Sequence, residues 1–340
     1  MRRRGQGGID IPAKSARVNY QRTDALRRAM PHMSQSAMAA LVKFAKANDL
    51  SDIGSSRASF QRARDACLED TPFAPQIITC TLFGDPPFAN KDILIVNPAA
   101  YLYLAYKKGG GFFKHLNKCL ASTPSSAERP WRLVLYSDEV VPGNQLAIAN
   151  SRKVWVVYFG FLELKQMGNE DSWCPLAAEP SHGLKRVSAG ISQVFAVIIE
   201  SFFGLQTYDM RGGIQLEGPN GERLRLFAVL SMVLQDGGAQ KFVWSCKGDG
   251  GTRPCFLCKN LVSSSSSVAA CDVSGMLVDD MVDADRLIPA TNEDIRNAIK
   301  RLAPFKETDS AGDFKLREQA IGFTLQNRAL LTQPELEDIV

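Results

Sequence analysis

Long hydrophobic runs are missing from this sequence of 340 residues. No stretch of 18 consecutive apolar residues occurs, so we expect no membrane-spanning helix and no membrane partner. The basic N-terminus is not followed by the apolar segment of a secretory signal, so we expect an intracellular protein that is not secreted. In a reducing compartment, clusters among the eight cysteines indicate metal binding more than disulfides.

Histidine is scarce, and several well-known catalytic patterns are absent. The three histidines, His32, His115 and His182, lie far apart, and no HExxH pattern occurs, which argues against a zinc hydrolase. The glycine-rich Gly248-Asp249-Gly250-Gly251 lacks the Lys-Ser/Thr ending of a phosphate-binding P-loop. Gly109-Gly110-Gly111 does not follow a predicted strand, and no Gly-x-Ser-x-Gly elbow is present. These absences argue against nucleotide-binding and serine-hydrolase classes.

Positive charge is concentrated at the N-terminus. The whole chain carries a net charge of +4, whereas residues 1–30 contain eight basic and two acidic side chains, a net charge of +6. Such an arm can contact phosphates or act as a nuclear-import signal, although a solvated tail explains it equally well. We therefore expect DNA as a partner and a nuclear location.

The pattern of the chain predicts four regions. Residues 1–30 form a basic flexible arm, residues 31–130 are mainly helical, residues 131–260 form the core, and residues 261–340 form a linker and a helical tail. Helices at 34–49 and 51–67 could form a helix-turn-helix DNA reader, although a plain helical hairpin is more common. Tyr101, Tyr103 and Tyr106 with Lys107 and Lys108 could stack on DNA, although a core-facing helix edge explains the aromatic residues better.

The core region changes to a β-rich pattern. Strands are predicted at residues 131–136 and 154–164, a helix at 187–203, and a hairpin of two strands at 212–217 and 223–234. This order predicts a mixed α/β fold with a largely buried central sheet. Outside the core we expect an irregular segment at 71–90 with one short strand at 77–80, helices around the glycines of 96–118, and helices at 291–303 and 314–331.

Two aspartates follow predicted strands. Asp138 comes after the apolar residues 133–136, and Asp236 comes after the apolar residues 227–234. Carboxylates at neighbouring strand ends can share two Mg²⁺ or Mn²⁺ ions, the arrangement that activates an attacking oxygen in phosphoryl transfer. An aspartate after a strand is more often a turn residue or a helix cap, so both explanations stay open.

Cysteine spacing suggests a second metal site. Cys255 and Cys258 form a C-x-x-C turn, which can place two thiolates on one tetrahedral zinc ion. Cys246 and Cys271 are the nearest candidates for the other two ligands of a structural zinc site. A redox pair lacks the flanking strand and helix it would need, and buried free thiols are the remaining alternative.

The order of these motifs resembles the catalytic region of CACTA and Plavaka-like DDE transposases. The resemblance rests on LVLYSD at 133–138, KVWVVY at 153–158, LFAVLS at 226–231, Asp236 and the C-x-x-C turn, and it covers residues 131–260. It implies an RNase H-like core with a cysteine insertion, in which an Asp-Asp-acid triad binds two divalent metals and cuts and joins DNA. Asp138 would be the first acid, Asp236 the second, and Cys255 and Cys258 the zinc knuckle.

The sequence departs from the family pattern at three places. Glu139 replaces a glycine after the first acid, and Gly237-Gly238 replaces Leu-Pro after the second. The family's third acid lies beyond the knuckle, commonly in an Asp-x-x-His helix, but no histidine follows His182. The acidic stand-ins Asp279, Asp280, Asp283 and Glu293 carry no distinguishing mark.

We therefore expect a transposase-derived chain that ends before its third acid and does not cut DNA by itself. The alternative is a catalytically inactive, transposon-derived module that binds DNA or protein. A homo-oligomer is compatible with either.

Overall fold

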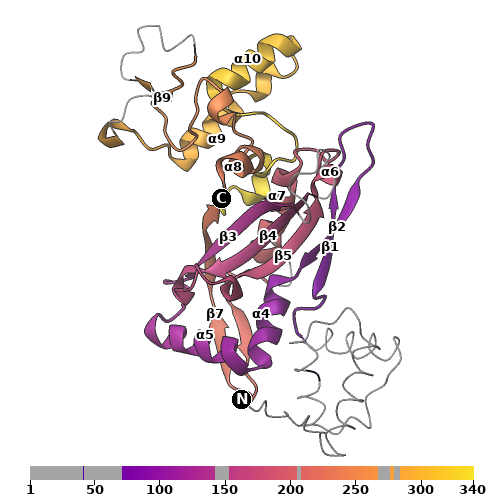
Figure 1. The fold of residues 1–340 in the computed structure, drawn as a ribbon, viewed down its shortest axis with the longest axis vertical. Coiled ribbons are helices and arrows are strands. Elements are labelled where there is room, and N and C mark those ends of the chain that lie inside the picture. Colours follow the sequence, from indigo (N-terminus) through magenta and orange to yellow (C-terminus); the bar gives the residue numbers. More distant parts are fainter. Residues whose placement is uncertain (1–40, 42–70, 142–152, 205–207, 267–275, 279–283) are drawn as a thin grey trace, which may run out of the picture. The chain divides into compact units, whose positions relative to one another are not determined.

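The computed structural model describes residues 71–141, 153–204, 208–266, 276–278 and 284–340, together with Leu41 (Figure 1). The chain divides into two compact units, Met1–Asp65 and Ala66–Val340, and the elements described below belong to the second. The basic arm and, apart from Leu41, the helices expected at 34–49 and 51–67 lie outside the described residues.

A four-stranded mixed sheet forms the centre of the second unit. Its strands are β3 (Trp131–Val140), β4 (Val154–Phe161), β5 (Cys174–Pro180) and β8 (Ala228–Leu234). The spatial order is β5-β4-β3-β8. Strand β4 is antiparallel to both β3 and β5, and β8 is parallel to β3. Seven α-helices accompany the sheets among the described residues, so the predicted mixed α/β class is confirmed.

Helix α7 (Ile191–Phe203) and helix α4 (Pro98–Lys107) bury one face of this sheet. The fully buried ring of Phe159 in β4 lies 5.3 Å from Phe202 in α7 and 6.1 Å from Tyr101 in α4, measured between ring centroids. Helix α7 is apolar almost all round, as expected of a helix enclosed by other elements. Tyr103 and Tyr106 are buried in the same core, which favours the packing explanation over base stacking for these tyrosines.

Among the strands that the sequence did not predict are β2 (Lys91–Val96), in a separate hairpin, and β5, at the edge of the central sheet. β1 (Ile77–Leu82) is longer than the predicted short strand and pairs with β2 (Lys91–Val96) in an antiparallel hairpin. β5 was also missed, because Pro175 and Pro180 interrupt the usual strand composition. Pairing with β4 along one edge nevertheless holds β5 extended.

The strand predicted at 223–234 is two strands. β6 (Ile214–Glu217) pairs with β7 (Arg223–Leu226), whereas β8 leaves that hairpin and joins the central sheet. The switch occurs at Phe227, whose N–H donates to the Ser125 hydroxyl and whose carbonyl accepts from Trp131 N–H at 2.8 Å. A continuous apolar run does not reveal this change of partner.

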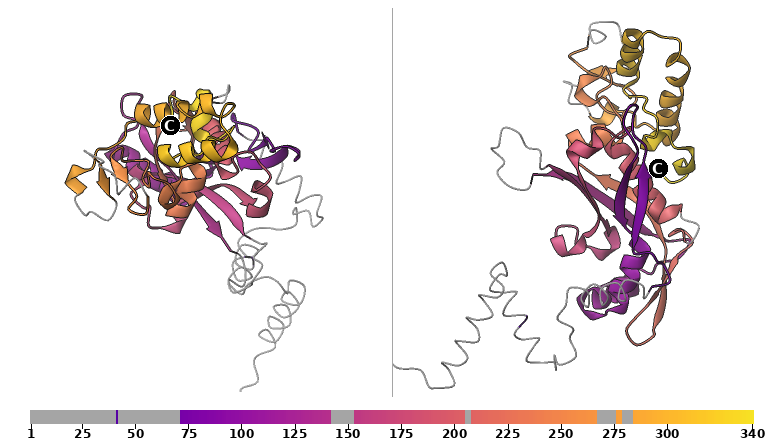
Figure 2. Two further views of the ribbon diagram at one scale, coloured as in Figure 1. Left: turned by 90° about the horizontal axis from the view of Figure 1, so that it is seen from above. Right: turned by 90° about the vertical axis from the view of Figure 1, so that its right-hand side faces the viewer.

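The remaining helices are α5 (Gly110–Ser122), α6 (Ser181–Leu184), α8 (Gly237–Val243), α9 (Asn292–Lys300) and α10 (Ala311–Ile321). The last two are shorter than predicted, and α10 ends at Gly322 because its φ of 91° is left-handed. Figure 2 shows α9 and α10, in orange and yellow, at the end of the sheet opposite α4 and α5. Short strands β9 (Leu261–Val262) and β10 (Leu277–Val278) pair beside them.

None of the helices described combines the length and the hydrophobicity that crossing a bilayer requires.

Candidate functional site

Asp138 and Asp236 belong to neighbouring parallel strands. Tyr136 of β3 lies opposite Leu234 of β8, the last pair of the β3–β8 ladder, and each aspartate lies two residues beyond that pair. We predicted that Asp138 follows the end of its strand. It lies within β3 instead, because β3 continues to Val140 through its pairing with β4. Both aspartates therefore lie just past the carboxyl end of the β3–β8 ladder.

Tyr136 lies close to both carboxylates. Its hydroxyl lies 3.4 Å from Asp138 Oδ2, in keeping with side chains two residues apart on one face of a strand. Burial raises the pKa of Tyr136, and the negative charges of Asp138 and Asp236 raise it further. The period-2 alternation of a strand could have suggested Tyr136 as a neighbour of Asp138.

Aromatic rings extend this side of the sheet. Tyr136 stacks against Tyr158 with ring centroids 6.1 Å apart, and Trp173 lies 5.5 Å from Tyr136. These rings are only partly buried. They provide a rigid apolar border beside Asp138, which strengthens electrostatic interactions by limiting solvent on one side.

Asp236 also caps a helix. Its Oδ1 accepts a hydrogen bond from Ala239 N–H at 2.6 Å, the interaction of an N-cap residue at the start of α8. The cap explanation left open by the sequence therefore holds for this residue. Oδ2 accepts no hydrogen bond from any described residue, so the carboxylate keeps an oxygen that could bind a cation.

Two polar contacts fix the strands around the acid pair. The Gln235 side-chain amide donates to the Ser137 hydroxyl at 2.8 Å and so ties β8 to β3. Lys153 Nζ lies 2.7 Å from Glu139 Oε2. Partial burial raises the pKa of Glu139, but the hydrogen bonds of Lys153 and Ser181 and the charges of Lys153 and Lys185 together lower it by more. Glu139 is therefore neutralised by Lys153 and poorly suited to serve as a third metal ligand.

Within the ranges that the structure covers, no three His, Cys, Asp or Glu side chains are arranged so that they could hold a metal ion together. Glu293, at the start of α9, therefore joins no such group. Asp279, Asp280 and Asp283 lie outside the described residues. The described site is a pair of acids.

The cysteine motif brings two thiols together. Cys255 Sγ and Cys258 Sγ are 3.7 Å apart. Two thiolates bound at about 2.3 Å to one tetrahedral zinc are separated by about 3.8 Å, so the pair fits that ion. Cys271, the predicted fourth ligand, lies outside the described residues.

Cys246 is half-buried and close enough to Cys255 to feel its charge, but the expected convergence of Cys246, Cys255 and Cys258 into one metal-binding group does not occur among the described residues. Burial raises the pKa of Cys246, and Cys255 raises it in addition. Burial and the neighbouring Cys255 likewise raise the pKa of Cys258. Backbone bridges to Phe323 and Pro289 hold Cys246 and Cys258 in place.

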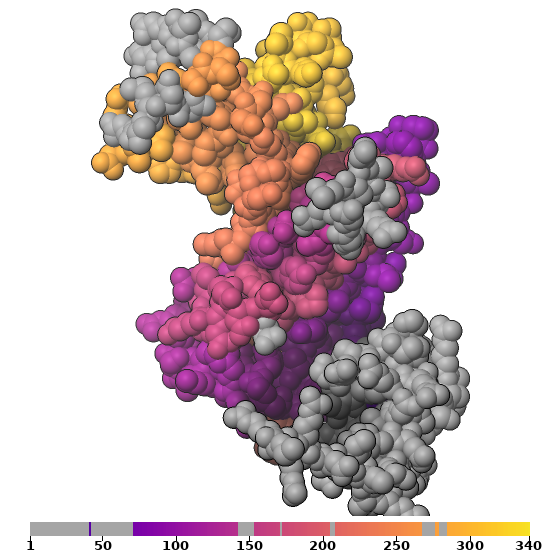
Figure 3. Space-filling model, viewed as in Figure 1, coloured from indigo at the N-terminus to yellow at the C-terminus, as the bar shows by residue number. Residues whose placement is uncertain are grey.

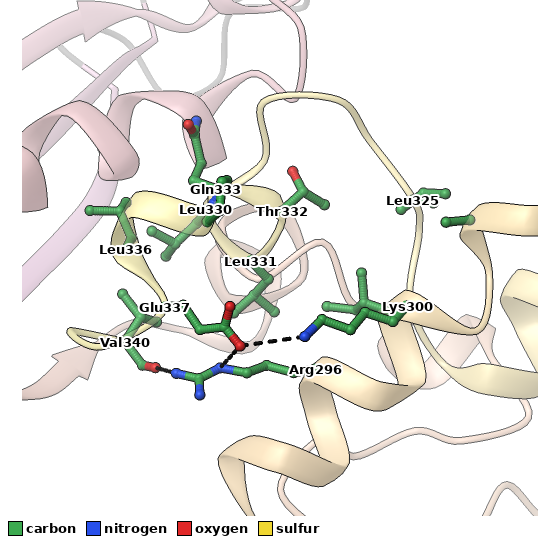
Figure 4. Close-up of a pocket in the computed structure, with 13 residues that line it drawn as sticks. Arg296, Lys300, Leu325, Leu330, Leu331, Thr332, Gln333, Leu336, Glu337 and Val340 are labelled. Carbon is green, nitrogen blue, oxygen red and sulfur yellow. Dashed lines mark hydrogen bonds and ion pairs between the residues drawn. The ribbon is translucent and has the colours of Figure 1, made fainter.

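The main hollows of the surface lie elsewhere. One of about 250 Å³ lies between α9 and the C-terminal segment (Figure 4), where Glu337 is 3.7 Å from Arg296 and 3.5 Å from Lys300. Arg296 also donates to the Val340 carbonyl oxygen at 3.1 Å. Arg296, Lys300 and Glu337 therefore all have partners within this hollow. Larger hollows of about 420 and 460 Å³ beside β8 and β1 do not include Asp138 or Asp236 either.

Neither the family models nor the curated proteins searched give a match to this chain, so the argument for function rests on the geometry of the acid pair and the cysteine pair.

Proposed function

We propose that this chain derives from a metal-dependent DNA transposase, and that Asp138 and Asp236 are the two acids of its DNA-cleaving site. The observation that carries the proposal is the position of both aspartates just beyond the last pair of one parallel ladder. The carboxyl ends of strands are where sheets most often present functional side chains.

The arrangement of the sheet supports an RNase H-like core. An antiparallel meander of β3, β4 and β5 is followed by α7, and the chain then returns to place β8 parallel to β3. This is the order in which the transposase-like motifs occur along the chain, with the first acid in the first strand of the core and the second acid after β8.

The acids supply negative charge where a phosphodiester would react. Divalent metal ions held at such a pair would activate the attacking oxygen and stabilise the leaving oxygen. Asp138 and the free oxygen of Asp236 would hold the ions, and the α8 cap would fix the orientation of the Asp236 carboxylate. The Gln235–Ser137 hydrogen bond would hold the two strands, and therefore the two carboxylates, at a constant separation.

A second candidate function is an inactive DNA- or protein-binding module. It is favoured by the α8 cap, which explains Asp236 without a metal, and by the pair having no third acid among the described residues. Only the first candidate predicts that Asp138 holds a divalent metal ion.

A nuclease and strand-transfer assay in Mg²⁺ or Mn²⁺ tests whether the acid pair suffices for cleavage, whereas Mn²⁺ binding that depends on Asp138 separates the two candidates. The purified chain is compared with Asp138→Asn and with Asp85→Asn, an exposed aspartate whose side chain makes no hydrogen bond with a described residue. With two acids we expect no cleavage by the 340-residue chain alone. Cleavage that Asp138→Asn abolishes and Asp85→Asn preserves would establish the catalytic site and contradict its incompleteness.

We also propose that Cys255 and Cys258 bind a structural zinc ion, whose further ligands, such as Cys271, would come from outside the described residues. Zinc binding requires deprotonated thiols, so the raised pKa of Cys258 implies that affinity falls as pH is lowered. We expect one zinc per chain by elemental analysis, lost in Cys255→Ser and retained in Cys80→Ser. Absence of zinc from the parent chain, with folding unchanged by a chelator, would contradict the site.

A further inference from the structure

Helix α5 presents a basic face to solvent. Lys114 and Lys118 are exposed and lie four residues apart, which places them on the same side of the helix. Leu116 and Cys119 face the core instead. Lys108, exposed just before α5, adds a third positive charge. We call Lys108, Lys114 and Lys118 the α5 lysine row, and Figure 3 shows this segment, in purple, at the molecular surface.

No acidic side chain balances this row within its own segment. The 35 residues 93–127 contain no aspartate or glutamate. None of the three lysines forms an ion pair with a residue that the structure covers. Some exposed cations elsewhere in the described fold, such as Arg223, Lys259 and Lys300, do have carboxylate partners. Uncompensated like charges repel one another, so a polyanion that binds them relieves an unfavourable interaction.

The residues that precede Lys114 and follow Lys118 on this face have small side chains or none. Gly110 and Gly111 precede Lys114 and have open space where a side chain would lie. Ala121 and Ser122 continue the same exposed stripe after Lys118. The lysine ammonium groups are therefore the outermost groups available for contact along this face.

We propose that the α5 lysine row binds the phosphate backbone of duplex DNA. This inference rests on the proposed function, in which DNA is the substrate, and it names a contact surface that is separate from the acid pair and from the basic arm. Four helical residues span about 6 Å, close to the axial rise of roughly two nucleotides of one DNA strand. Lys114 and Lys118 can thus reach phosphates roughly two nucleotides apart on one strand. Contacts of this kind position DNA without reading its sequence.

The test measures binding of a fluorescein-labelled DNA duplex by anisotropy at several KCl concentrations, with no Mg²⁺ or Mn²⁺ added so that the acid pair does not contribute. The parent chain is compared with the triple variant Lys108→Gln, Lys114→Gln, Lys118→Gln. The control triple variant, Lys300→Gln, Lys306→Gln, Lys315→Gln, removes the same charge from the α9–α10 region. All six side chains are exposed, so circular dichroism and the melting temperature should show both variants folded.

The slope of log K against log [KCl] should become less steep by about 2 to 3 in the α5 variant, because each phosphate contact contributes about 0.9. The control variant should change the slope by less than about 1. An unchanged slope in the α5 variant, or equal losses in both variants, would overturn the proposal. So would α5-dependent binding to vesicles containing phosphatidylserine without α5-dependent binding to DNA.

The outcome is independent of the catalytic proposal. Asp85→Asn should leave this binding unchanged. Mn²⁺ binding that does not depend on Asp138, together with an intact α5 effect, would contradict only the catalytic site, and the reverse result would contradict only the α5 lysine row.

Discussion

At the residue scale, Asp236 combines two roles that substitution can separate. Asp236→Ala removes the cap of α8 and should lower the free energy of unfolding by about 1 kcal/mol. Asp236→Asn keeps a side-chain oxygen that can accept from Ala239 N–H, so it should change the free energy of unfolding by only a few tenths of a kcal/mol. Urea denaturation without divalent metal measures both. Equal losses in the two variants would mean that the charge of Asp236, and not its hydrogen bond, stabilises α8.

Buried thiols make the free energy of unfolding depend on pH in the alkaline range. Burial raises the pKa of Cys174 from 9.0 to about 11, and a hydrogen bond from Tyr101 offsets part of that effect. The unfolded chain then releases this proton at lower pH than the folded chain. The stabilisation is complete below about pH 9 and is lost as pH rises towards 11.

Urea midpoints at pH 8 and pH 10 test this dependence. The free energy of unfolding should fall over that interval in the parent chain and fall less steeply in Cys174→Ala. Because Cys80 also has a pKa raised to about 11, chiefly by burial and then by Glu200, some dependence should remain in that variant. An identical pH dependence in both proteins would contradict the assignment to Cys174.

At the scale of elements, the contact between the sheet and α7 is the main source of rigidity beneath the acid pair. Phe159 is fully buried between Phe202, Phe161 and Tyr101. Phe159→Ala should lower the free energy of unfolding by about 3 to 5 kcal/mol, because it removes a large buried ring and leaves a cavity.

Phe242→Ala is the matched control for that substitution. Phe242 on α8 is 62% exposed, so its loss should change stability by no more than about 0.5 kcal/mol. Chemical denaturation of both variants checks the comparison. A loss below about 1 kcal/mol for Phe159→Ala would show that β4 and α7 are not packed as described.

Local patterns in the sequence predicted where helices and strands form better than they predicted which strands pair with each other. The β-rich runs before Asp138 and around residue 157, and the apolar spacing of α7, follow directly from side-chain type and period. The hairpin partner of β1, the edge strand β5 and the switch at Phe227 depend on hydrogen bonds between distant segments. Such pairings leave no periodic trace in one strand.

The candidate site was predictable to a similar extent. Apolar runs followed by aspartate singled out Asp138 and Asp236, and C-x-x-C spacing singled out Cys255 and Cys258. The adjacency of β3 and β8 and the cap formed by Asp236 could only come from the fold, because both depend on the path of the chain between residues 140 and 228. Gln235 was missed because an amide next to an aspartate carries no signal of its own.

At the scale of the whole molecule, elements far apart in sequence share one core. The main hydrophobic cluster runs from Leu82 to Leu336, so the helices before residue 131 and the segment after residue 260 both support the central sheet. A smaller cluster around Ile299, Leu302 and Phe323 packs against Cys246 and Phe256. The cysteine motif therefore packs against the C-terminal helices.

Binding of Mn²⁺ to the full chain is the measurement that tests the central claim most directly. Calorimetry would compare the parent with Asp138→Asn, Asp236→Asn and the double variant, since Mn²⁺ prefers oxygen ligands and its binding does not require catalysis. The account predicts that each single substitution weakens binding by about tenfold or more, equivalent to about 1.4 kcal/mol, and that the double variant is little worse. Binding by both single variants with the parent's affinity would contradict a shared metal site at Asp138 and Asp236.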